Sequence, residues 1–413
     1  MNEQKLAIVL GGTSPHVLLV NKLKERGYYV LLIDYLENPP AKKVADEHLR
    51  ESTLDQDKVL EIAKERKADL VISTCIDQAN SVCCYVAEKL GLPHPYSYKT
   101  SLEVTDKGLM KRIFVENGIP TSNYTTTESV DSIDWNLVQY PAVVKPVDCN
   151  SSKGVRRVDS DEETRLRVAE AIEMSRTKTA IIEGFNSGAE IQVDCVSTQS
   201  GVKVMMTRQK QKIASDGNDM VLQSYSSVFP APLSDEFKRQ AQEIAEKIAN
   251  AFKLENTPFF YQAIVTETGI KVLEFAPRIG GGLSYHVLKS FGDYDAVECA
   301  IDSFLGKTIV VEPKEQTRFH STNLLYMRPG VFDSVVGLEE LHQKGFVTDC
   351  FVMKSKGCKI DSDMRSSNRV AAFIVEGESY EELKQKARKT FASVEIRDIQ
   401  GNDLLNREIY SNL

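Results

Sequence analysis

Two oxygen-bearing side chains, Gln262 and Glu274, have the types and spacing that most directly suggest chemistry. They lie in a largely apolar stretch, residues 259–275, that reads as a β-hairpin. A three-residue turn would pair Thr266 with Ile270 and set Gln262 directly opposite Glu274, unless a bulge shifts the register by one residue. Directly opposed residues have Cβ atoms about 4.5–5.5 Å apart. The pair is therefore either a self-satisfied amide–carboxyl hydrogen bond or two oxygen ligands for a cation.

The residues after Glu274 favour the second interpretation. Arg278 follows four positions later, and residues 280–282 are all glycine. Glycine lets the backbone approach a ligand closely, and a guanidinium binds carboxylate or phosphate oxygens. Mg²⁺ prefers one or two protein carboxylates together with phosphate oxygens and water. The sequence thus favours a Mg²⁺ site at Gln262 and Glu274 with Arg278 close by.

Lys145 stands near the end of an apolar strand at residues 141–146. Because an unpaired buried ammonium is unfavourable, this lysine must either reach solvent or meet an anion. The segment that follows is small, polar and rich in amide and hydroxyl donors, and it includes Ser151, Ser152, Lys153 and Gly154. Such loops hold phosphate groups, but ordinary hairpin turns share the composition.

Lys107 falls in the first turn of an expected helix that Thr105 and Asp106 would cap and that would end near Asn117. The helix dipole disfavours a cation at this end. Lys107 is therefore either solvated and screened by Asp106, or it lies beside an anion.

An apolar strand at residues 181–185 runs into a turn that is followed by Glu190. Free backbone amide and carbonyl groups at such a strand end can bind the edge of an adenine, and a carboxylate can accept hydrogen bonds from ribose hydroxyls. A solvated surface carboxylate is the alternative reading of Glu190.

The elements that must position these side chains change in character along the chain. The first hundred residues alternate apolar strands with amphipathic helices, which is typical of a doubly wound parallel sheet. After about residue 100 the strands become shorter and glycine turns more frequent, which indicates α+β lobes. The strongest helix patterns cover residues 17–26, 57–66, 79–90, 161–175, 234–252, 293–305 and 379–392.

Composition narrows the class of protein. The chain has 413 residues, a formal net charge of -8 and 42% hydrophobic residues. These values predict several globular domains and disfavour non-specific binding to nucleic acid or to anionic membranes. We find no apolar run of about 18 residues or more and no secretory leader, so we expect a cytoplasmic protein. The eight cysteines form no C-x-x-C pair and are expected to be reduced thiols, mostly in the core.

Two nucleotide-binding motifs are incomplete. Gly11 and Gly12, with Asp34 after the second strand, resemble a dinucleotide fingerprint, but the later glycines of G-x-G-x-x-G are missing. Residues 306–308 read Gly-Lys-Thr, yet Ile301 replaces the first glycine of a P-loop and the segment follows a helix rather than a strand. Neither motif predicts function.

The ordered set of Lys107, the strand ending at Lys145, the 151–154 loop, the 182–185 strand, Glu190, Gln262 and the 274–278 segment resembles the ATP-grasp superfamily. The resemblance implies a pre-ATP-grasp domain similar to a Rossmann fold at residues 1–100 and an ATP-grasp domain at 101–316. That domain would contain a small lid lobe at about 120–186. Residues 317–413 look like the C-terminal α+β part of amino-acid and dipeptide ligases.

The resemblance also implies a role for each matching residue. Lys107 and Lys145 would hold the α and β phosphates of ATP, and the loop around Ser151, Ser152, Lys153 and Gly154 would close over the triphosphate. Glu183, Gly184 and Phe185 would line the adenine, and Glu190 would bind the ribose. Gln262 and Glu274 would ligate Mg²⁺ or Mn²⁺, and Arg278 would steady the transferred phosphoryl group or an acyl phosphate. Many members carry Asn at the position of Ala276, often as a further metal ligand.

What the resemblance implies about activity is an ATP-dependent, ADP-forming carboxylate–amine ligase that makes an amide through an acyl phosphate. The substrates would be a small carboxylate and an amine, such as two amino acids, and a homodimer is the default assembly. Phosphoryl transfer of this kind depends on positioning and charge neutralisation rather than on an enzyme nucleophile. The alternatives are a bicarbonate-activating enzyme similar to carbamoyl-phosphate synthetase or biotin carboxylase, and an ATP-binding regulator without activity, which Ala276 would favour.

Overall fold

The computed structural model describes residues 4–149, 153–213, 223–361 and 368–410, which form two compact units. The first unit comprises residues 1–188, 193–206 and 233–314, and the second comprises residues 189–192, 207–232 and 315–413. Within the described ranges, no helix is long and apolar enough to cross a membrane. The bounds of the three domains expected from the sequence stay a prediction.

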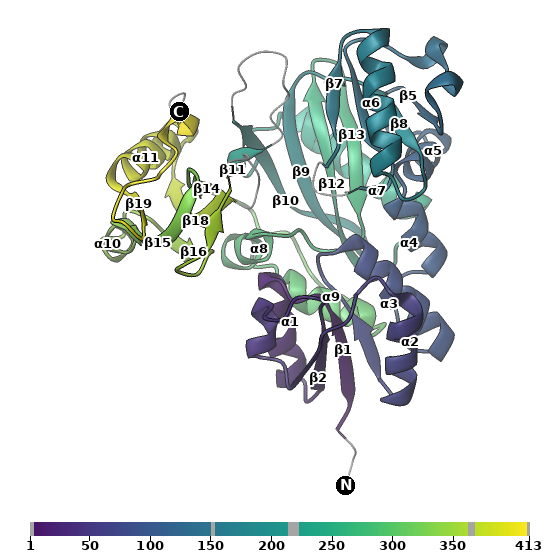
Figure 1. The fold of residues 1–413 in the computed structure, drawn as a ribbon, viewed down its shortest axis with the longest axis horizontal. Helices are drawn as coiled ribbons and strands as arrows, with labels where there is room; N and C mark the ends of the chain where they lie inside the picture. The colour runs from purple at the N-terminus through teal and green to yellow at the C-terminus, as the bar shows by residue number, and fades with distance from the viewer. Residues whose placement is uncertain (1–3, 150–152, 214–222, 362–367, 411–413) are drawn as a thin grey trace. The chain divides into compact units, whose positions relative to one another are not determined.

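The first unit begins with a four-stranded parallel sheet in the order β3-β2-β1-β4. Helix α1 lies on one side of this sheet and α2 and α3 on the other (Figure 1). Every residue of the central strand β1 is buried, as expected when helices cover both faces of a parallel sheet. The doubly wound N-terminal fold is therefore confirmed. Its elements are β1 (Leu6–Leu10), α1 (Ser14–Glu25), β2 (Tyr29–Ile33), η1 (Pro40–Lys43), β3 (Glu47–Leu49), α2 (Gln56–Glu65), β4 (Leu70–Ile72), α3 (Asp77–Leu90) and α4 (Tyr98–Thr105).

The glycine loop after β1 is occupied by the chain itself. The amide of Gly12 donates to Oδ2 of Asp34 at 2.7 Å, and the amide of Leu36 donates to Oδ1 at 2.8 Å. A Cβ added at Gly12 would lie 2.4 Å from the Cβ of Pro39. The carboxylate that a dinucleotide-binding protein would offer to a ribose thus binds this loop instead.

A small lobe follows, built from a mixed set of short elements. Its four-stranded sheet has the order β5-β8-β6-β7, and α6 packs on it. Between helix α6 and the sheet lies a hydrophobic core that includes Ala142, Val144, Val168 and Ile182. The elements are α5 (Lys107–Glu116), β5 (Tyr124–Thr127), η2 (Val130–Ser132), η3 (Trp135–Leu137), β6 (Ala142–Pro146), β7 (Arg156–Val158), α6 (Asp161–Met174) and β8 (Ala180–Gly184).

The remainder of the first unit holds the hairpin predicted from the sequence. Strand β13 pairs with β12, which neighbours β9, which in turn neighbours β10. Helix α7 is amphipathic and begins at the cap Ser234, whose hydroxyl accepts a hydrogen bond from the amide of Phe237. The elements are β9 (Ala189–Thr198), β10 (Gly201–Lys212), α7 (Asp235–Ala251), β12 (Thr257–Thr266), β13 (Gly269–Ala276), α8 (Ser284–Gly292) and α9 (Ala296–Phe304). Residues 189–192 of β9 and 207–212 of β10 belong to the second unit.

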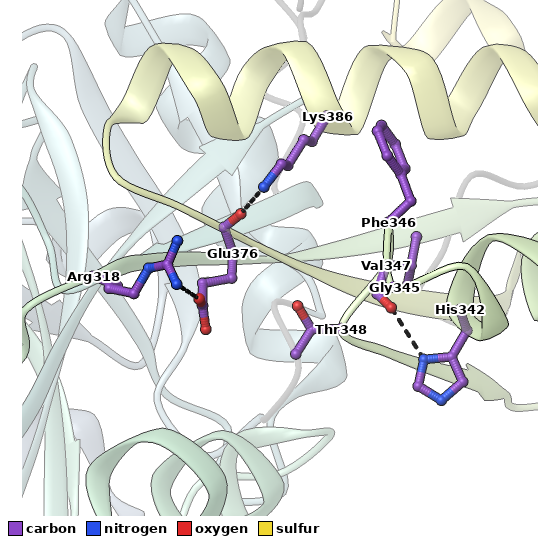
Figure 2. A pocket seen from close by; sticks show the side chains of 8 residues that line it. All are labelled: Arg318, His342, Gly345, Phe346, Val347, Thr348, Glu376 and Lys386. Carbon is purple, nitrogen blue, oxygen red and sulfur yellow. Dashed lines mark hydrogen bonds and ion pairs between the residues drawn. The ribbon is translucent and has the colours of Figure 1, made fainter.

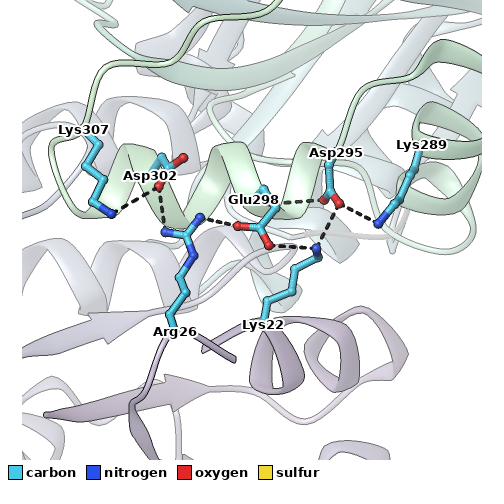
Figure 3. Close-up of polar contacts among 7 residues, drawn as sticks. All are labelled: Lys22, Arg26, Lys289, Asp295, Glu298, Asp302 and Lys307. Carbon is cyan, nitrogen blue, oxygen red and sulfur yellow. Dashed lines mark hydrogen bonds and ion pairs between the residues drawn. The ribbon is translucent and has the colours of Figure 1, made fainter. Parts of the chain in front are cut away.

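An ion-pair network joins α1 to α9 (Figure 3). Lys22, whose side chain is 8% exposed, lies 2.9 Å from both Asp295 and Glu298. Arg26, one turn further along α1, contacts Glu298 and lies 2.7 Å from Asp302. Burial alone would raise the pKa of Asp295 and of Glu298. Hydrogen bonds from Lys289 and Lys22 outweigh it and lower the pKa of Asp295, and those from Lys22 and Arg26 lower the pKa of Glu298. These ion pairs therefore hold the N-terminal βα segment against α9, the last helix of this unit.

The second unit contains two antiparallel arrays around one core, which includes Tyr326, Phe332, Phe373 and Phe391. One array has the order β11-β14-β18-β16 and the other β17-β15-β19. The elements are β11 (Ser224–Phe229), β14 (Phe319–Tyr326), β15 (Gly330–Val336), α10 (Leu338–Gln343), β16 (Asp349–Val352), β17 (Lys359–Ile360), β18 (Arg369–Gly377), α11 (Tyr380–Ser393), β19 (Glu395–Asp398) and η5 (Arg407–Tyr410).

A cavity of about 450 Å³ opens in the second unit between residues 345–348, β18 and α11 (Figure 2). Each charged side chain of its lining has a partner, since Glu376 pairs with Arg318 at 2.5 Å and Lys386 pairs at 2.8 Å with Glu382, which lies outside the lining. Nδ1 of His342 donates to the carbonyl oxygen of Val347 at 3.0 Å. Because these charged side chains are paired, the cavity lining indicates neither an anionic nor a cationic ligand.

Some expectations about the elements need correction. The helix expected after a cap at Thr105 and Asp106 is confirmed as α5, since Asp106 accepts from the amide of Leu109 at 2.9 Å and the helix ends at its cap Asn117. The preceding helix α4, which ends at Thr105, was not expected. Helix α8 was not expected, and the last helix of this unit begins at Ala296, capped by Asp295, rather than at Asp293. The cysteines are unpaired as expected, but only half are buried: Cys83, Cys84, Cys195 and Cys299.

Candidate active site

The sheet of the small lobe has a core face and a face that carries charge. Ala142 and Val144 of β6 point into the core, so Lys145 must point away from it. On β8, Ile182 faces the same core and Glu183 faces away. Lys145 pairs with Ile181, and Glu183 is its diagonal neighbour, which a long side chain can reach. Strand alternation alone therefore brings Lys145 and Glu183 together.

Helix α5 adds two more ammonium groups to this face. Lys107 and Lys111 are four residues apart, so they lie on one side of the helix. The ammonium of Lys107 donates to the carbonyl oxygen of Cys149 at 2.6 Å. That of Lys111, only 1% exposed, donates to Thr121 Oγ1 at 2.5 Å and to the carbonyl of Val272 at 3.2 Å.

Glu183 is the anion at the centre of this cluster. Its Oε1 lies 2.7 Å from Nζ of Lys145, and its Oε2 lies 3.1 Å from Nζ of Lys111. Burial by itself would raise the pKa of this carboxyl, but the two lysines outweigh burial and lower it to about 2. Glu183 is therefore ionised at every physiological pH, and it fixes the ammonium of Lys145.

The electrostatics of Lys107 show which charges surround it. Its pKa is lowered, first by burial and then by the neighbouring charge of Lys145, while Glu274, Glu183 and Asp77 act in the opposite direction. Lys145 and Glu274, expected from the sequence to share a site, thus both act on the same ammonium group. The charge of Glu274, the carboxylate expected to bind metal, therefore favours the protonated form of Lys107.

The loop after β6 is anchored at both described ends. Asp148 Oδ2 accepts from the amides of Arg176 at 3.0 Å and Thr177 at 3.2 Å. Gly154 has a φ of +72°, and a Cβ there would lie 2.9 Å from Pro146. Lys153 is exposed. Ser151 and Ser152, expected to contact the triphosphate, lie outside the described residues.

The hairpin places Gln262 directly opposite Glu274, as predicted. The turn is shorter than expected, because Thr266 pairs with Gly269 across two residues rather than with Ile270. A register shift between Gln262 and Ala263 then restores the expected pairing. Two deviations of one residue therefore cancel.

The donor set fits a Mg²⁺ ion that arrives with a nucleotide. No cluster of three or more His, Cys, Asp or Glu side chains suited to a metal occurs in the part of the chain that the structure describes. Two neighbouring oxygen-bearing side chains, Gln262 and Glu274, would be too few for a permanent metal site. They suffice where phosphate oxygens and water complete the shell.

Arg278 is buried against a residue that sequence reasoning missed, Asp77. Its Nε and Nη2 donate to the two carboxylate oxygens of Asp77, each at 2.6 Å. Its Nη1 donates to the carbonyl of Ile279 at 2.9 Å, and the guanidinium carbon lies 5.1 Å from the centre of the Phe260 ring. Ala276 is 5% exposed, and its carbonyl accepts from the amide of Arg278 at 2.9 Å.

The strand end expected to line an adenine is partly occupied by backbone pairing. The amide of Gly184 donates to the carbonyl of Asn123 at 3.0 Å, and the amide of Phe185 donates to that of Pro141 at 2.9 Å. These two amides are therefore already paired, because the neighbouring segments continue the sheet past β8, and the adenine-lining role of this strand end stays a prediction. The ring of Phe185 lies 5.0 Å below the guanidinium of Arg157.

Glu190, expected to bind ribose, belongs to the second unit together with Lys210 and Lys212. Each ammonium lies 2.5 Å from one of its carboxylate oxygens. Burial would raise the pKa of Glu190, but the two lysines outweigh it and lower that pKa. Its alternative reading as a freely solvated surface carboxylate is wrong, since its side chain is only 11% exposed.

Comparison with known proteins agrees with this architecture. The family model for the phosphoribosylglycinamide synthetase ATP-grasp (A) domain matches residues 105–282. The model for L-amino acid ligase C-terminal domain 2 matches residues 323–398. The crystal structure of L-amino acid ligase from Bacillus licheniformis superimposes with a TM-score of 0.78 at 20% identity, covering 96% of this chain and 100% of that chain.

Curated relatives carry the name formate-dependent phosphoribosylglycinamide formyltransferase. That of Ignicoccus hospitalis is 25% identical over 288 residues, which is 66% of this chain and 69% of the relative. That of Methanocaldococcus jannaschii is 25% identical over 250 residues, which is 59% of this chain and 62% of the relative. The chain thus spans about two thirds of the length of these relatives.

Fold, family models and relatives together define the class of protein. The chain belongs to the ATP-grasp superfamily. It is an ATP-dependent, ADP-forming ligase of that superfamily, and its cofactors are ATP and Mg²⁺.

Proposed function

We propose that this ligase joins a small carboxylate to an amine, with amino acids as the substrate class, through an acyl-phosphate intermediate. The observation that carries the proposal is the buried cluster in which Glu183 pairs with Lys145 at 2.7 Å and with Lys111 at 3.1 Å. Lys111 also donates to the carbonyl of Val272 on β13. That strand carries Glu274, with Arg278 four residues beyond. The amino-acid specificity is supported by the match of residues 323–398 to an L-amino acid ligase domain. The substrate carboxylate would attack the γ-phosphate, ADP would leave, and the amine would then displace phosphate to form the amide.

The chain's own residues would perform this reaction by placing charge. Lys107 and Lys145 would bind the phosphates between β6 and α5, with Glu183 keeping the Lys145 ammonium in place. The guanidinium of Arg278 would hold the transferred phosphoryl group. Bound Mg²⁺, held by Gln262 and Glu274, would neutralise negative charge on the phosphates. Positioning and electrostatic stabilisation account for most catalysis in phosphoryl transfer, so no enzyme nucleophile is needed.

The test is a screen of amino-acid pairs for ATP-dependent phosphate release, with the amide product identified by mass spectrometry. Phosphate release should require both a carboxylate and an amine. Glu274→Ala should abolish turnover, whereas Glu170→Ala, which removes a surface carboxylate on α6, should leave it unchanged. Turnover by Glu274→Ala at the wild-type rate would refute the metal assignment.

A second candidate is activation of a one-carbon carboxylate. It is favoured by the printed name of the curated relatives, which specifies formate and a glycinamide. The same screen distinguishes it, because phosphate release would then depend on formate or bicarbonate and not on a second amino acid.

A further inference from the structure

The pairing of Arg278 with Asp77 joins two parts of the chain that are 201 residues apart. Asp77 is the first residue of α3 and follows the carboxyl end of the parallel strand β4. Ligands of such sheets bind beyond the carboxyl ends of their strands. Asp77 is therefore in a place where an acidic side chain can act on a bound substrate or on a residue that touches one.

The contacts of Arg278 fix its orientation and leave the donors on one edge of its guanidinium available to a ligand. Two donors go to Asp77 and one to the carbonyl of Ile279, while the ring of Phe260 lies against the planar face. A guanidinium has five N–H donors. Among the described contacts two of them, one on Nη1 and one on Nη2, have no acceptor, and such a pair suits the oxygens of a phosphoryl group or a carboxylate.

The Asp77–Arg278 pair also lies within the electrostatic reach of the proposed catalytic cluster. Glu274 acts on Arg278 and Asp77 acts on Lys107. Burial would lower the pKa of Arg278, but Asp77 outweighs it, so the guanidinium stays charged. Because both carboxylate oxygens of Asp77 already accept hydrogen bonds from Arg278, Asp77 is poorly placed to bind a substrate ammonium directly.

We propose that Asp77 is a positioning residue: it holds the guanidinium of Arg278 so that its remaining edge faces the transferred phosphoryl group. This inference rests on the proposed function, in which Arg278 touches that group. Asp77 itself forms and breaks no bond. Its contribution is geometric, and a displacement of the guanidinium by about 1 Å is enough to lower a rate by about 100-fold.

The test compares Asp77→Asn with a matched control, Asp302→Asn. Asp302 also pairs with an arginine, Arg26, at 2.7 Å, but in the network between α1 and α9. Affinities for Mg·ADP alone and for Mg·ADP with aluminium fluoride, which stands in for the transferred phosphoryl group, are measured by calorimetry. Asp77→Asn should bind Mg·ADP like the wild type, but the fluoride complex about 10- to 100-fold more weakly. The control should bind both like the wild type.

Kinetics separate positioning from a direct role. Asp77→Asn should lower kcat by the same factor and leave KM for ATP unchanged. Because Asp77 acts through Arg278, the double variant Asp77→Asn/Arg278→Gln should be no slower than Arg278→Gln alone. Multiplicative losses in the double variant would overturn the proposal and indicate that Asp77 contacts substrate itself.

Failure of the proposal differs from failure of the proposed function. If the wild type binds both nucleotide complexes and Asp77→Asn binds them equally well, the positioning role is wrong while the ligase assignment stands. If the wild type does not bind Mg·ADP at all, the proposed function fails. Should Asp77→Asn not fold by circular dichroism, Asp77→Glu keeps the charge pair while displacing the guanidinium. It should then show the same selective loss, and wild-type binding by that variant would refute the proposal.

Discussion

Replacing Glu183 by Gln should destabilise the small lobe strongly at neutral pH. Glu183 is 3% exposed and lies between two buried ammonium groups, those of Lys111 and Lys145. Glutamine has nearly the same shape but no charge, so both lysines would lose their common counter-ion. The fold would then contain two adjacent cations without compensation.

The size of the effect follows from the pKa of Glu183, which the two lysines lower from 4.5 to about 2 despite burial. One pKa unit corresponds to about 1.4 kcal/mol, so the shift corresponds to about 3 kcal/mol in favour of the charged form. Breaking one partner of a buried ion pair costs a similar amount, about 3–5 kcal/mol. We therefore expect Glu183→Gln to lower the free energy of unfolding by about 3 kcal/mol.

Urea unfolding measures this change. Trp135 is the single tryptophan of the chain and packs against the core of the same lobe, so its fluorescence reports on the relevant region. Glu170→Gln is the control, because Glu170 pairs with Arg167 on α6 with its side chain 45% exposed. That change should cost below about 1 kcal/mol.

The pH dependence gives a second criterion. Because the folded-state pKa of Glu183 lies below its unfolded value, its contribution is complete above about pH 4.5 and is lost as the pH falls toward 2. The difference between wild type and Glu183→Gln should therefore shrink in acid. Equal stability of Glu183→Gln and Glu170→Gln at pH 7, or a difference that grows in acid, would refute the reasoning.

Two further predictions concern other buried groups. Burial lowers the pKa of His16 from 6.5 to about 4, so the folded state resists protonation and the wild-type free energy of unfolding should fall by about 2 kcal/mol between pH 7 and pH 5. Urea unfolding of His16→Gln should lack this part of the pH dependence. A pH profile of His16→Gln equal to that of the wild type would contradict the prediction. A Cβ at Gly188, whose φ is +147°, would lie 2.1 Å from the carbonyl oxygen of Val265, so Gly188→Ala should cost at least about 2 kcal/mol in thermal unfolding. The control Gly281→Ala, where a Cβ meets nothing within 4 Å, should unfold close to the wild-type temperature.

Sequence patterns predicted the elements whose signals are local and strong. Helices α6, α7 and α11 begin at serine caps and were expected within a residue or two of their observed ends. The short helices α4 and α8 were missed, since eight or nine residues give too few turns for a clear periodicity. The opposition of Gln262 and Glu274 was predicted correctly, although the turn and the bulge that produce it were not.

The residues that sequence reasoning missed depend on contacts between distant segments. Lys111 lies four residues after Lys107 on the same helix face, which was a usable signal, but a lysine next to polar neighbours is ordinarily assigned to solvent. Its burial follows from Glu183 and Val272, which belong to two other strands. The one local signal for a role of Asp77 was its position as an acidic residue at the start of a helix that follows a parallel strand. Its partner Arg278 is 201 residues away in the sequence, so the pair could not be predicted.

The ion-pair network between α1 and α9 has a consequence for biosynthesis. Lys22 and Arg26 are made early in translation, whereas Asp295, Glu298 and Asp302 leave the ribosome only after most of the chain. The nascent N-terminal sheet therefore spends most of its synthesis with the surface meant for α9 uncovered. The N-terminal sheet can therefore gain its contacts with α9 only after residue 304 has been made.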